Sequence, residues 1–311
     1  HTQTFHKFES FRSMRAFALP QLMAQAGYRT AQIGKLHVAP ESVFHFDQYL
    51  KGNPRNAVQM AEVCKPVFED ESGTPFFLYF ATSDPHRGGG RDQTFSGEHK
   101  PDRFGNLPKK KAYPGVEEVF YDPGKVIVPG FLPDTPESRA EIANYYQSCS
   151  RIDQGLGRLV ELLKKNGKWD NTVIIYTADH GMAFPGAKTT VYEAGLRVPF
   201  VVRHPGVEKK GRTNEAMLSH TDLTPTILDL AGALNEKKTA PAKPLPFDKV
   251  GVGENSGKRP VKYHGRSWLP ILEETKPEGW DEVSASHTFH EIQMYYPMRV
   301  IRDRKYKLIW N

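Results

Sequence analysis

The chain has 311 residues, of which 38% are hydrophobic, 11% are aromatic and 25% are charged. This composition is typical of a folded globular protein, excludes the disordered and fibrous classes, and at this length allows a large domain with a smaller companion. The formal net charge of +6 favours an anionic partner, but the basic residues are dispersed and no nucleic-acid-binding motif is present.

The first predicted helix and strand lead directly into polar residues. Residues 16–26 carry apolar side chains at helical spacing, and residues 28–34 predict a short buried strand. Lys35 and His37 follow that strand at once.

A second predicted strand also ends in a polar cluster. Residues 75–82 form an uninterrupted apolar run, which is typical of a parallel-sheet strand covered on both faces, and Asp84 and His86 follow it. Residues 88–135 are rich in Gly, Pro and Lys and show little periodicity. Such a long excursion is often functional, and we interpret it as a loop over the site.

Residues 136–167 predict a long amphipathic helix that ends at Asn166-Gly167. Its apolar stripe comprises residues 142, 145, 149, 152, 156, 159 and 163. The two cysteines of the chain, Cys64 and Cys149, are too few for a disulfide framework and have neither metal-binding nor redox spacing.

The strand–helix alternation continues through the second half of the chain. Residues 171–179 predict a third buried strand that ends in an acid, and His180 follows it. After a loop that holds Lys188, residues 198–202 predict a fourth strand and residues 221–232 a capped helix. The alternation predicts an α/β fold with a mainly parallel, doubly wound sheet flanked by helices.

The C-terminal part has a different pattern. Residues 295–311 predict two alternating strands joined by a tight turn at residues 302–304, which indicates a smaller antiparallel sheet. We therefore divide the chain into a main domain, residues 1–235, a linker or surface insertion, residues 236–262, and the start of a smaller subdomain, residues 263–311.

Three predicted strands thus end in clusters of polar residues. In open α/β sheets ligands bind outside the carboxyl ends of the strands, so we expect these clusters to converge. Cationic and imidazole groups beside an acid suit the binding of an anion, the holding of a metal and the movement of a proton, as hydrolysis of a sulfate or phosphate ester requires. Taken singly, Lys35, His37 and His86 have an ordinary alternative as solvated or capping residues, and Asp179 could cap a helix.

Several ordered segments of the chain resemble the sulfatases of the alkaline-phosphatase-like superfamily, and among them the sulfamidase (heparan N-sulfatase) group and its bacterial relatives. The segments are AGYRTAQIGKLHVAPESVFHFD (26–47), DPHRGG (84–89), VPGFLPDTPESRAEIANYY with SRIDQGLG (128–157), TADHGMAFPGAKTTVYEAG (177–195), DLTPTILDLAG (222–232), GRSWLPILE (265–273) and HEIQMYYPMR (290–299).

The resemblance implies a formylglycine-dependent hydrolase that removes sulfate from a sulfated sugar or glycosaminoglycan, with N-sulfoglucosamine suggested by the sulfamidase group. A divalent cation, usually calcium, would hold the sulfate. Lys35 and His37 match residues that bind the sulfate oxygens and the nucleophile, and His86 matches the histidine that protonates the leaving group. Lys188 lies where sulfatases commonly have a sulfate-binding lysine.

Asp179 matches a metal-ligand aspartate, and His180 takes the place where many members have an asparagine ligand. Because calcium prefers oxygen, His180 either touches the sulfate instead or serves a different metal. The same resemblance implies a substrate-binding role for Asp84, Arg87, His290 and Glu291.

The nucleophile motif of the family, Cys or Ser followed by x-Pro-x-Arg, is absent from these 311 residues, and so are the paired aspartates that accompany it. The chain starts without Met in polar, aromatic-rich sequence without the layout of a signal peptide, and it stops inside a strand-like run. We therefore expect a piece of a longer enzyme that begins after the nucleophile, and we expect this piece to be inactive alone. The resemblance implies a periplasmic, extracellular or lysosomal location.

Two alternatives stay open. One is a phosphate or phosphonate monoesterase of the same superfamily, and the other is a non-catalytic protein that binds sulfated glycans. As partner we expect a sulfated saccharide substrate and no nucleic acid. We expect no membrane span, because no apolar run has the required length. The oligomeric state stays open, with a dimer among the options.

Overall fold

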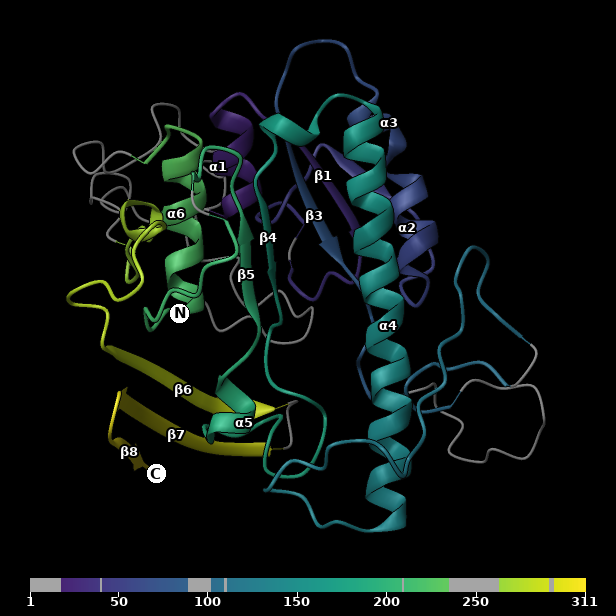
Figure 1. The fold of residues 1–311 in the computed structure, drawn as a ribbon. Helices are drawn as coiled ribbons and strands as arrows, with labels where there is room; N and C mark the ends of the chain where they lie inside the picture. Colours follow the sequence, from purple (N-terminus) through teal and green to yellow (C-terminus); the bar gives the residue numbers. More distant parts are fainter. Residues whose placement is uncertain are drawn as a thin grey trace.

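A computed structural model describes residues 18–39, 41–88, 102–108, 111–208, 210–234, 263–290 and 294–311, and for residues 289, 290, 294 and 295 it describes the backbone alone. The strands stand between α6 on one side and α4 on the other, and a separate small sheet lies at one end of the molecule (Figure 1). Among the described helices, none combines the length and the apolar character needed to cross a membrane.

The parallel sheet is built from three strands in the order β2-β1-β3. Its central strand, β1 (Arg29–Gly34), pairs in parallel with β2 (Gln48–Leu50) and with β3 (Phe76–Ala81). The helix α1 (Leu19–Gln25) precedes β1, as the periodicity predicts. The strands β1 and β3 confirm the predicted parallel sheet, whereas the three-residue β2 is too short to leave a pattern in the sequence.

The core of this sheet lies against three helices. The helices α2 (Ala57–Val63) and α3 (Lys65–Phe68) come between β2 and β3, and α4 (Pro136–Lys165) packs beside α2. Burial of their apolar side chains together with those of β1 is the main favourable contribution to the stability of this half of the fold. The buried residues of the cluster are Ala31, Ile33, Met60, Ala61, Cys64, Val67, Phe68, Leu162 and Leu163.

The long helix α4 begins where Thr135 caps it by accepting a hydrogen bond from the backbone N–H of Ser138. Its two ends bury apolar residues, as the stripe predicts. Its middle does not, because that part of the helix faces a buried polar network described below. The buried residues of α4 are Ile142, Ala143, Gln147, Ser148, Arg151, Gly155, Leu162 and Leu163.

The strands β4 (Ile174–Thr177) and β5 (Phe200–Arg203) form a two-stranded sheet and run antiparallel, with Ile175 opposite Val202. The expected sheet is mainly parallel, and this pair is an antiparallel exception to it. The connection between them, residues 178–199, is long enough for a crossover but contains only the four-residue helix α5 (Glu193–Leu196), whereas parallel neighbours are usually joined through a full α-helix. The helix α6 (Leu223–Leu230) follows β5 as predicted.

The C-terminal sheet has the antiparallel order β6-β7-β8, formed by β6 (Glu282–His290), β7 (Met294–Asp303) and β8 (Lys307–Trp310). The hairpin of β7 and β8 confirms the predicted antiparallel pair, and its turn lies slightly later than expected. The polar strand β6 was not predicted. Short 3-10 helices span Trp169–Asn171, His220–Asp222 and Leu269–Ile271.

The fold class is therefore the predicted one, an α/β arrangement with a parallel sheet and a separate, small antiparallel sheet. The predicted linker, residues 236–262, lies outside the described residues. In the predicted loop of residues 88–135, the described parts contain neither helix nor strand. They are nevertheless packed, because Phe104, Val126 and Leu132 join a second buried cluster with residues of α4 and Phe184.

Candidate functional site

His86 lies where three of the predicted polar clusters meet. Its Nε2 atom is 3.4 Å from the Nζ atom of Lys188. Burial, followed by the positive charges of Lys188, Lys35, Arg55 and His180, lowers the pKa of His86 to about 4. Side chains that follow β1, β3 and β4 therefore act on one imidazole, as the strand-end argument predicts.

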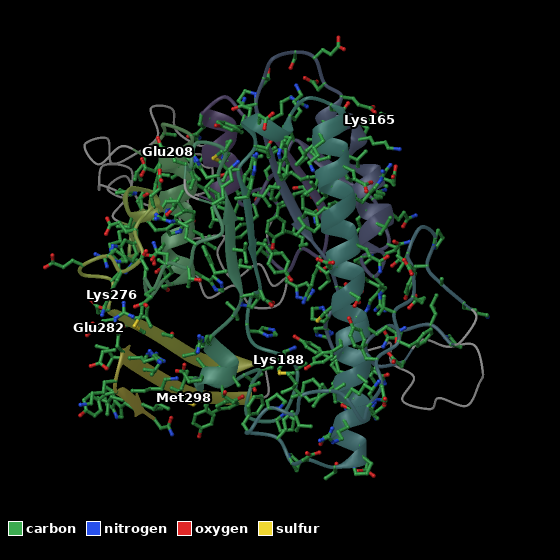
Figure 2. All side chains as sticks on the ribbon, in the orientation of Figure 1. Lys165, Lys188, Glu208, Lys276, Glu282 and Met298 are labelled. Atoms are coloured by element: carbon green, nitrogen blue, oxygen red, sulfur yellow. The ribbon has the colours of Figure 1, made fainter. Side chains whose placement is uncertain are left out.

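Lys188 reaches His86 from the segment between β4 and α5, and Figure 2 shows it between the C-terminal sheet and α4. The next residue, Thr189, has a left-handed backbone with φ of 69°, which is uncommon for a residue other than glycine. Its carbonyl oxygen accepts a hydrogen bond of 3.1 Å from the hydroxyl of Tyr296 on β7. The C-terminal sheet thus holds the segment that presents Lys188.

Asp179 and His180 form a pair at the end of β4. The Nδ1 atom of His180 lies 2.8 Å from the carbonyl oxygen of Gly181, and Nε2 lies 3.5 Å from Oδ2 of Asp179. A carbonyl oxygen can only accept, so Nδ1 carries the proton and the lone pair of Nε2 faces the carboxylate in the neutral ring. Two electron-pair donors facing each other suit a bound cation, and this tautomer is the usual one for a metal-bound histidine.

The turn that carries this pair is held by close packing. The backbone N–H of Gly181 donates to the carbonyl oxygen of Gly195 at 2.9 Å. A Cβ atom at Gly181 would lie 1.7 Å from the carbonyl oxygen of Ala194, so only glycine lets the turn approach α5 this closely.

Asp179 and His180 fit a divalent cation site as two of its ligands. Among the described residues, no three His, Cys, Asp or Glu side chains come together as a metal site. Calcium takes six to eight oxygen ligands, so the described part of the chain supplies a fraction of such a shell.

The structure places Asp84 away from solvent. Its side chain is 1% exposed, and its two carboxylate oxygens accept hydrogen bonds of 2.8 Å from Arg55 and from Arg151. Arg87 makes a bidentate ion pair with Glu141 on α4, with distances of 3.0 and 2.8 Å. Both residues of the DPHR segment that the resemblance links to substrate are thus bound to protein groups.

The structure describes the backbone of the remaining predicted residues except Glu291. Lys35 is half-buried directly after β1, where its backbone N–H donates to the carbonyl oxygen of Ala81, and His37 is exposed two residues further on. For His290 only the backbone in β6 is described, and Glu291 lies outside the described residues.

Four residues near the site were not predicted from the sequence. Arg55 and Arg151 bind Asp84. The negative charge of Asp179 acts to raise the pKa values of His220 and Tyr79. Burial lowers the pKa of His220 although Asp179 opposes the shift, and burial raises the pKa of Tyr79. The sequence offered one indication of His220. The residue ends a loop that follows a predicted strand, just before Asp222 at the start of the predicted helix.

The arrangement as a whole suits an anion with several oxygens. Lys35 and Lys188 supply positive charge beside a neutral imidazole, and that imidazole can accept a proton at Nε2 and donate it once protonated. Asp179 and His180 add ligands for a cation, which would increase the positive charge further.

Comparison with known proteins agrees with this chemistry. The sulfatase family model matches residues 6–233 of the chain. N-sulphoglucosamine sulphohydrolase of Homo sapiens is 36% identical over 99% of this chain and 59% of its own length. An ulvan-active sulfatase of Formosa agariphila is 30% identical over 93% of this chain and 49% of its own length. The chain thus spans about half the length of the curated relatives it matches.

Solved structures share the fold. The protein yidJ of Bacteroides fragilis matches with a TM-score of 0.63 and 20% identity over 95% of this chain and 67% of that chain. The phosphonate monoester hydrolase of Agrobacterium radiobacter matches with a TM-score of 0.62 and 17% identity over 94% of this chain and 71% of that chain. With the family model matching most of its length, the chain belongs to the sulfatase family.

Proposed function

We propose that the full-length gene product hydrolyses the sulfate ester or sulfamate of a sulfated sugar. The observation that carries this proposal is the position of His86, whose Nε2 atom lies 3.4 Å from Lys188 and whose pKa is lowered by burial and by several cations. The same cationic side chains that keep the His86 imidazole neutral would bind the sulfate oxygens.

In this proposal Lys35, His37 and Lys188 bind the sulfate, and His86 donates the proton that the departing oxygen or nitrogen requires. Asp179 and His180 would hold a divalent cation, for which calcium is the family's usual choice, and it would supply positive charge at the sulfate oxygens. A formylglycine nucleophile belongs to the same proposal. His290 and Glu291 are proposed to contact the sugar.

Asp84 and Arg87 have less direct roles here than the resemblance implies. The carboxylate of Asp84 is buried between two arginines, and the guanidinium of Arg87 is paired with Glu141. We propose that Asp84 acts through the backbone of the segment that carries His86, and that Arg87 reaches the substrate only if its pair with Glu141 opens.

The proposed substrate class is a glycosaminoglycan sugar, with N-sulfoglucosamine as the first candidate. The support is the 36% identity with the human N-sulphoglucosamine sulphohydrolase. The proposal places the enzyme in the periplasm, outside the cell or in a lysosome, as the resemblance implies.

The test measures sulfate release by the full-length protein from N-sulfated and 6-O-sulfated glucosamine and from aryl sulfate and aryl phosphate. We expect sulfate release from at least one saccharide, with aryl sulfate hydrolysed faster than aryl phosphate. Replacing His86 by Ala should lower kcat for the saccharide at least 100-fold, whereas His45→Ala, in an exposed loop, should leave it unchanged.

Two outcomes would replace the proposal. Faster turnover of aryl phosphate would identify a phosphate or phosphonate monoesterase, which uses the same fold. Binding of the sulfated saccharide without any turnover would identify a glycan-binding protein that has lost its catalysis.

A further inference from the structure

One guanidinium group holds the chain on both sides of His86. The Nη1 atom of Arg55 donates to Oδ1 of Asp84 at 2.8 Å, and its Nη2 atom donates to the carbonyl oxygen of Gly88 at 3.1 Å. Asp84 lies two residues before His86 and Gly88 lies two residues after it. Because the guanidinium is planar and rigid, these two hydrogen bonds fix the two ends of the segment relative to each other.

Arg55 is itself held in place by its neighbours. Its backbone N–H donates to Oδ1 of Asn53 at 3.0 Å, and the carbonyl oxygen of Pro54 accepts from the backbone N–H of Ser83 at 2.7 Å. The next residue, Asn56, is buried and caps α2. The loop before α2 and the loop after β3 are therefore joined directly beside His86.

Arg151 completes the network from the middle of α4. It donates from Nε to the other carboxylate oxygen of Asp84, and from Nη2 to the carbonyl oxygen of Phe104 at 2.9 Å. The Nη1 atom of Arg55 donates to the same carbonyl oxygen at 3.1 Å. Two arginines thus share one carboxylate, which leaves one positive charge in excess close to His86.

We infer that Arg55 is a positioning residue for His86, and that its two hydrogen bonds set the direction of the imidazole toward the leaving group. This inference rests on the proposed function and deepens it. It also accounts for the burial of Asp84, which serves as the anchor for Arg55 rather than as a group for the sugar.

The two arginines are expected to differ in what they do. Without Arg55, Asp84 keeps its hydrogen bond to the fully buried Arg151, so its carboxylate stays paired and the chain still folds. The tie to Gly88 is lost, however, and His86 gains freedom to turn. Arg55 is therefore the better residue to test for positioning, and Arg151 for stability.

The experiment compares Arg55→Met and Arg55→Lys with Arg139→Met in the full-length protein. Arg139 is a matched control because it also joins an aspartate, Asp134, to backbone carbonyl oxygens of a loop, but these partners belong to residues 123–134 and not to the segment that carries His86. We expect kcat to fall about 30-fold in Arg55→Met with KM changed less than threefold. Arg139→Met should keep the wild-type kcat.

The lysine variant separates charge from geometry. Lysine retains the positive charge but cannot bind Asp84 and Gly88 with one planar group. We therefore expect Arg55→Lys to keep the low pKa of His86, while kcat recovers only in part. Full recovery of kcat by lysine would overturn the positioning role.

A double-mutant cycle with His86→Ala provides the decisive readout. If Arg55 acts through His86, the loss in Arg55→Met should vanish once His86 is absent, so the double variant should match His86→Ala within twofold. Independent losses that multiply in the double variant would overturn the inference, as would a wild-type kcat in Arg55→Met.

A readout without turnover keeps the inference separate from the proposed function. If no sulfated substrate is hydrolysed, the proposed function fails, and NMR of the labelled His86 imidazole still decides the inference. We expect a single sharp ring signal in the wild-type protein and in Arg139→Met, and a broadened or split signal in Arg55→Met. An unchanged signal in Arg55→Met would contradict the positioning role.

Discussion

The Nζ atom of Lys188 lies 3.4 Å from the Nε2 atom of His86, although 102 positions separate the two residues in the chain. An ammonium group can only donate, so the imidazole accepts at Nε2 and is neutral in this arrangement. A neutral imidazole must gain a proton before it can act as a general acid. A bound anion that shares the charge of Lys188 would favour that protonation, so substrate binding and the acid form of His86 should be linked.

Removal of Lys188 should therefore raise the pKa of His86. Lys188→Met takes away a positive charge beside Nε2, so we expect the pKa to move from about 4 toward its ordinary value. Sulfate binding should weaken as well, with kcat/KM at least 10-fold lower. NMR titration of the labelled imidazole measures the first effect. Lys125→Met, at an exposed turn, is the control, and an unshifted pKa in Lys188→Met would contradict the prediction.

The lowered pKa of His86 also predicts how stability depends on pH. Between about pH 4 and pH 6.5 the unfolded chain binds a proton at this residue and the folded chain does not. The free energy of unfolding therefore falls as pH decreases through this window, and it is recovered above the unfolded pKa. Because His86 is only partly buried, we expect a contribution of about 1–2 kcal/mol.

Denaturant unfolding of the wild-type protein and of His86→Gln at pH 4.5 and pH 7.5 measures this contribution. The variant lacks the titrating group, so it should lose less stability between the two pH values than the wild-type protein. Equal losses in the two proteins would show that the pKa of His86 is the same in the folded and unfolded states, which would contradict the prediction.

The hydrogen bond from Tyr296 to Thr189 predicts that the C-terminal sheet supports the Lys188 segment. Tyr296→Phe removes the donor and should cost up to about 1 kcal/mol of stability. Because Thr189 holds a left-handed backbone next to Lys188, we also expect KM to rise several-fold. Tyr306→Phe, a residue that is 68% exposed in the turn between β7 and β8, should change neither quantity. An unchanged KM in Tyr296→Phe would contradict a supporting role of the C-terminal sheet for the Lys188 segment.

The sequence predicts those parts of the site that follow strands. Lys35, His86 and Asp179 each come after an apolar run, and the carboxyl ends of such strands converge in an α/β fold. Lys188 lies in a loop, and only the family resemblance marked it. Its position next to His86 depends on a contact between distant segments, which periodicity does not report.

The buried arginines were missed for a different reason. Arg151 lies in a helix whose apolar residues predict one buried stripe, and an arginine between them is ordinarily solvated. The helix buries it because Asp84 lies opposite, a pairing across 67 positions. The direction of β5 and the strand β6 were missed as well, since pairing direction depends on tertiary packing and β6, EVSASHTFH, is largely polar.

The close approach of Gly181 to α5 predicts a large effect of a single methyl group. Gly181→Ala would place Cβ 1.7 Å from the carbonyl oxygen of Ala194, so the turn must move, at a cost of about 3 kcal/mol. Gly157→Ala is the matched control, because it lies on α4 with nothing within 4 Å and should stabilise the protein by about 0.5–1 kcal/mol. Thermal unfolding of the two variants should give shifts of opposite sign, and a tolerated Gly181→Ala would contradict the packing.

The pair of Asp179 and His180 predicts a stabilising divalent cation in the full-length protein. A cation that binds the folded chain at 100 times its Kd adds about 2.7 kcal/mol to stability, so its addition to metal-stripped protein should raise Tm by several degrees. Asp179→Asn should lose most of this shift because a carboxylate charge is removed. Asp170→Asn, with a side chain 96% exposed, should keep it.

The His180→Asn variant identifies the metal. An amide oxygen is a better calcium ligand than an imidazole nitrogen, so a calcium site should give an equal or larger Tm shift with calcium in this variant. A site for a transition metal should instead give a larger shift with manganese or zinc in the wild-type protein, and His180→Asn should reduce it. If His180 contacts the sulfate and not the metal, the metal-dependent shift should not change, while KM for the sulfated sugar should rise. Equal Tm with and without every cation in the wild-type protein would exclude the site.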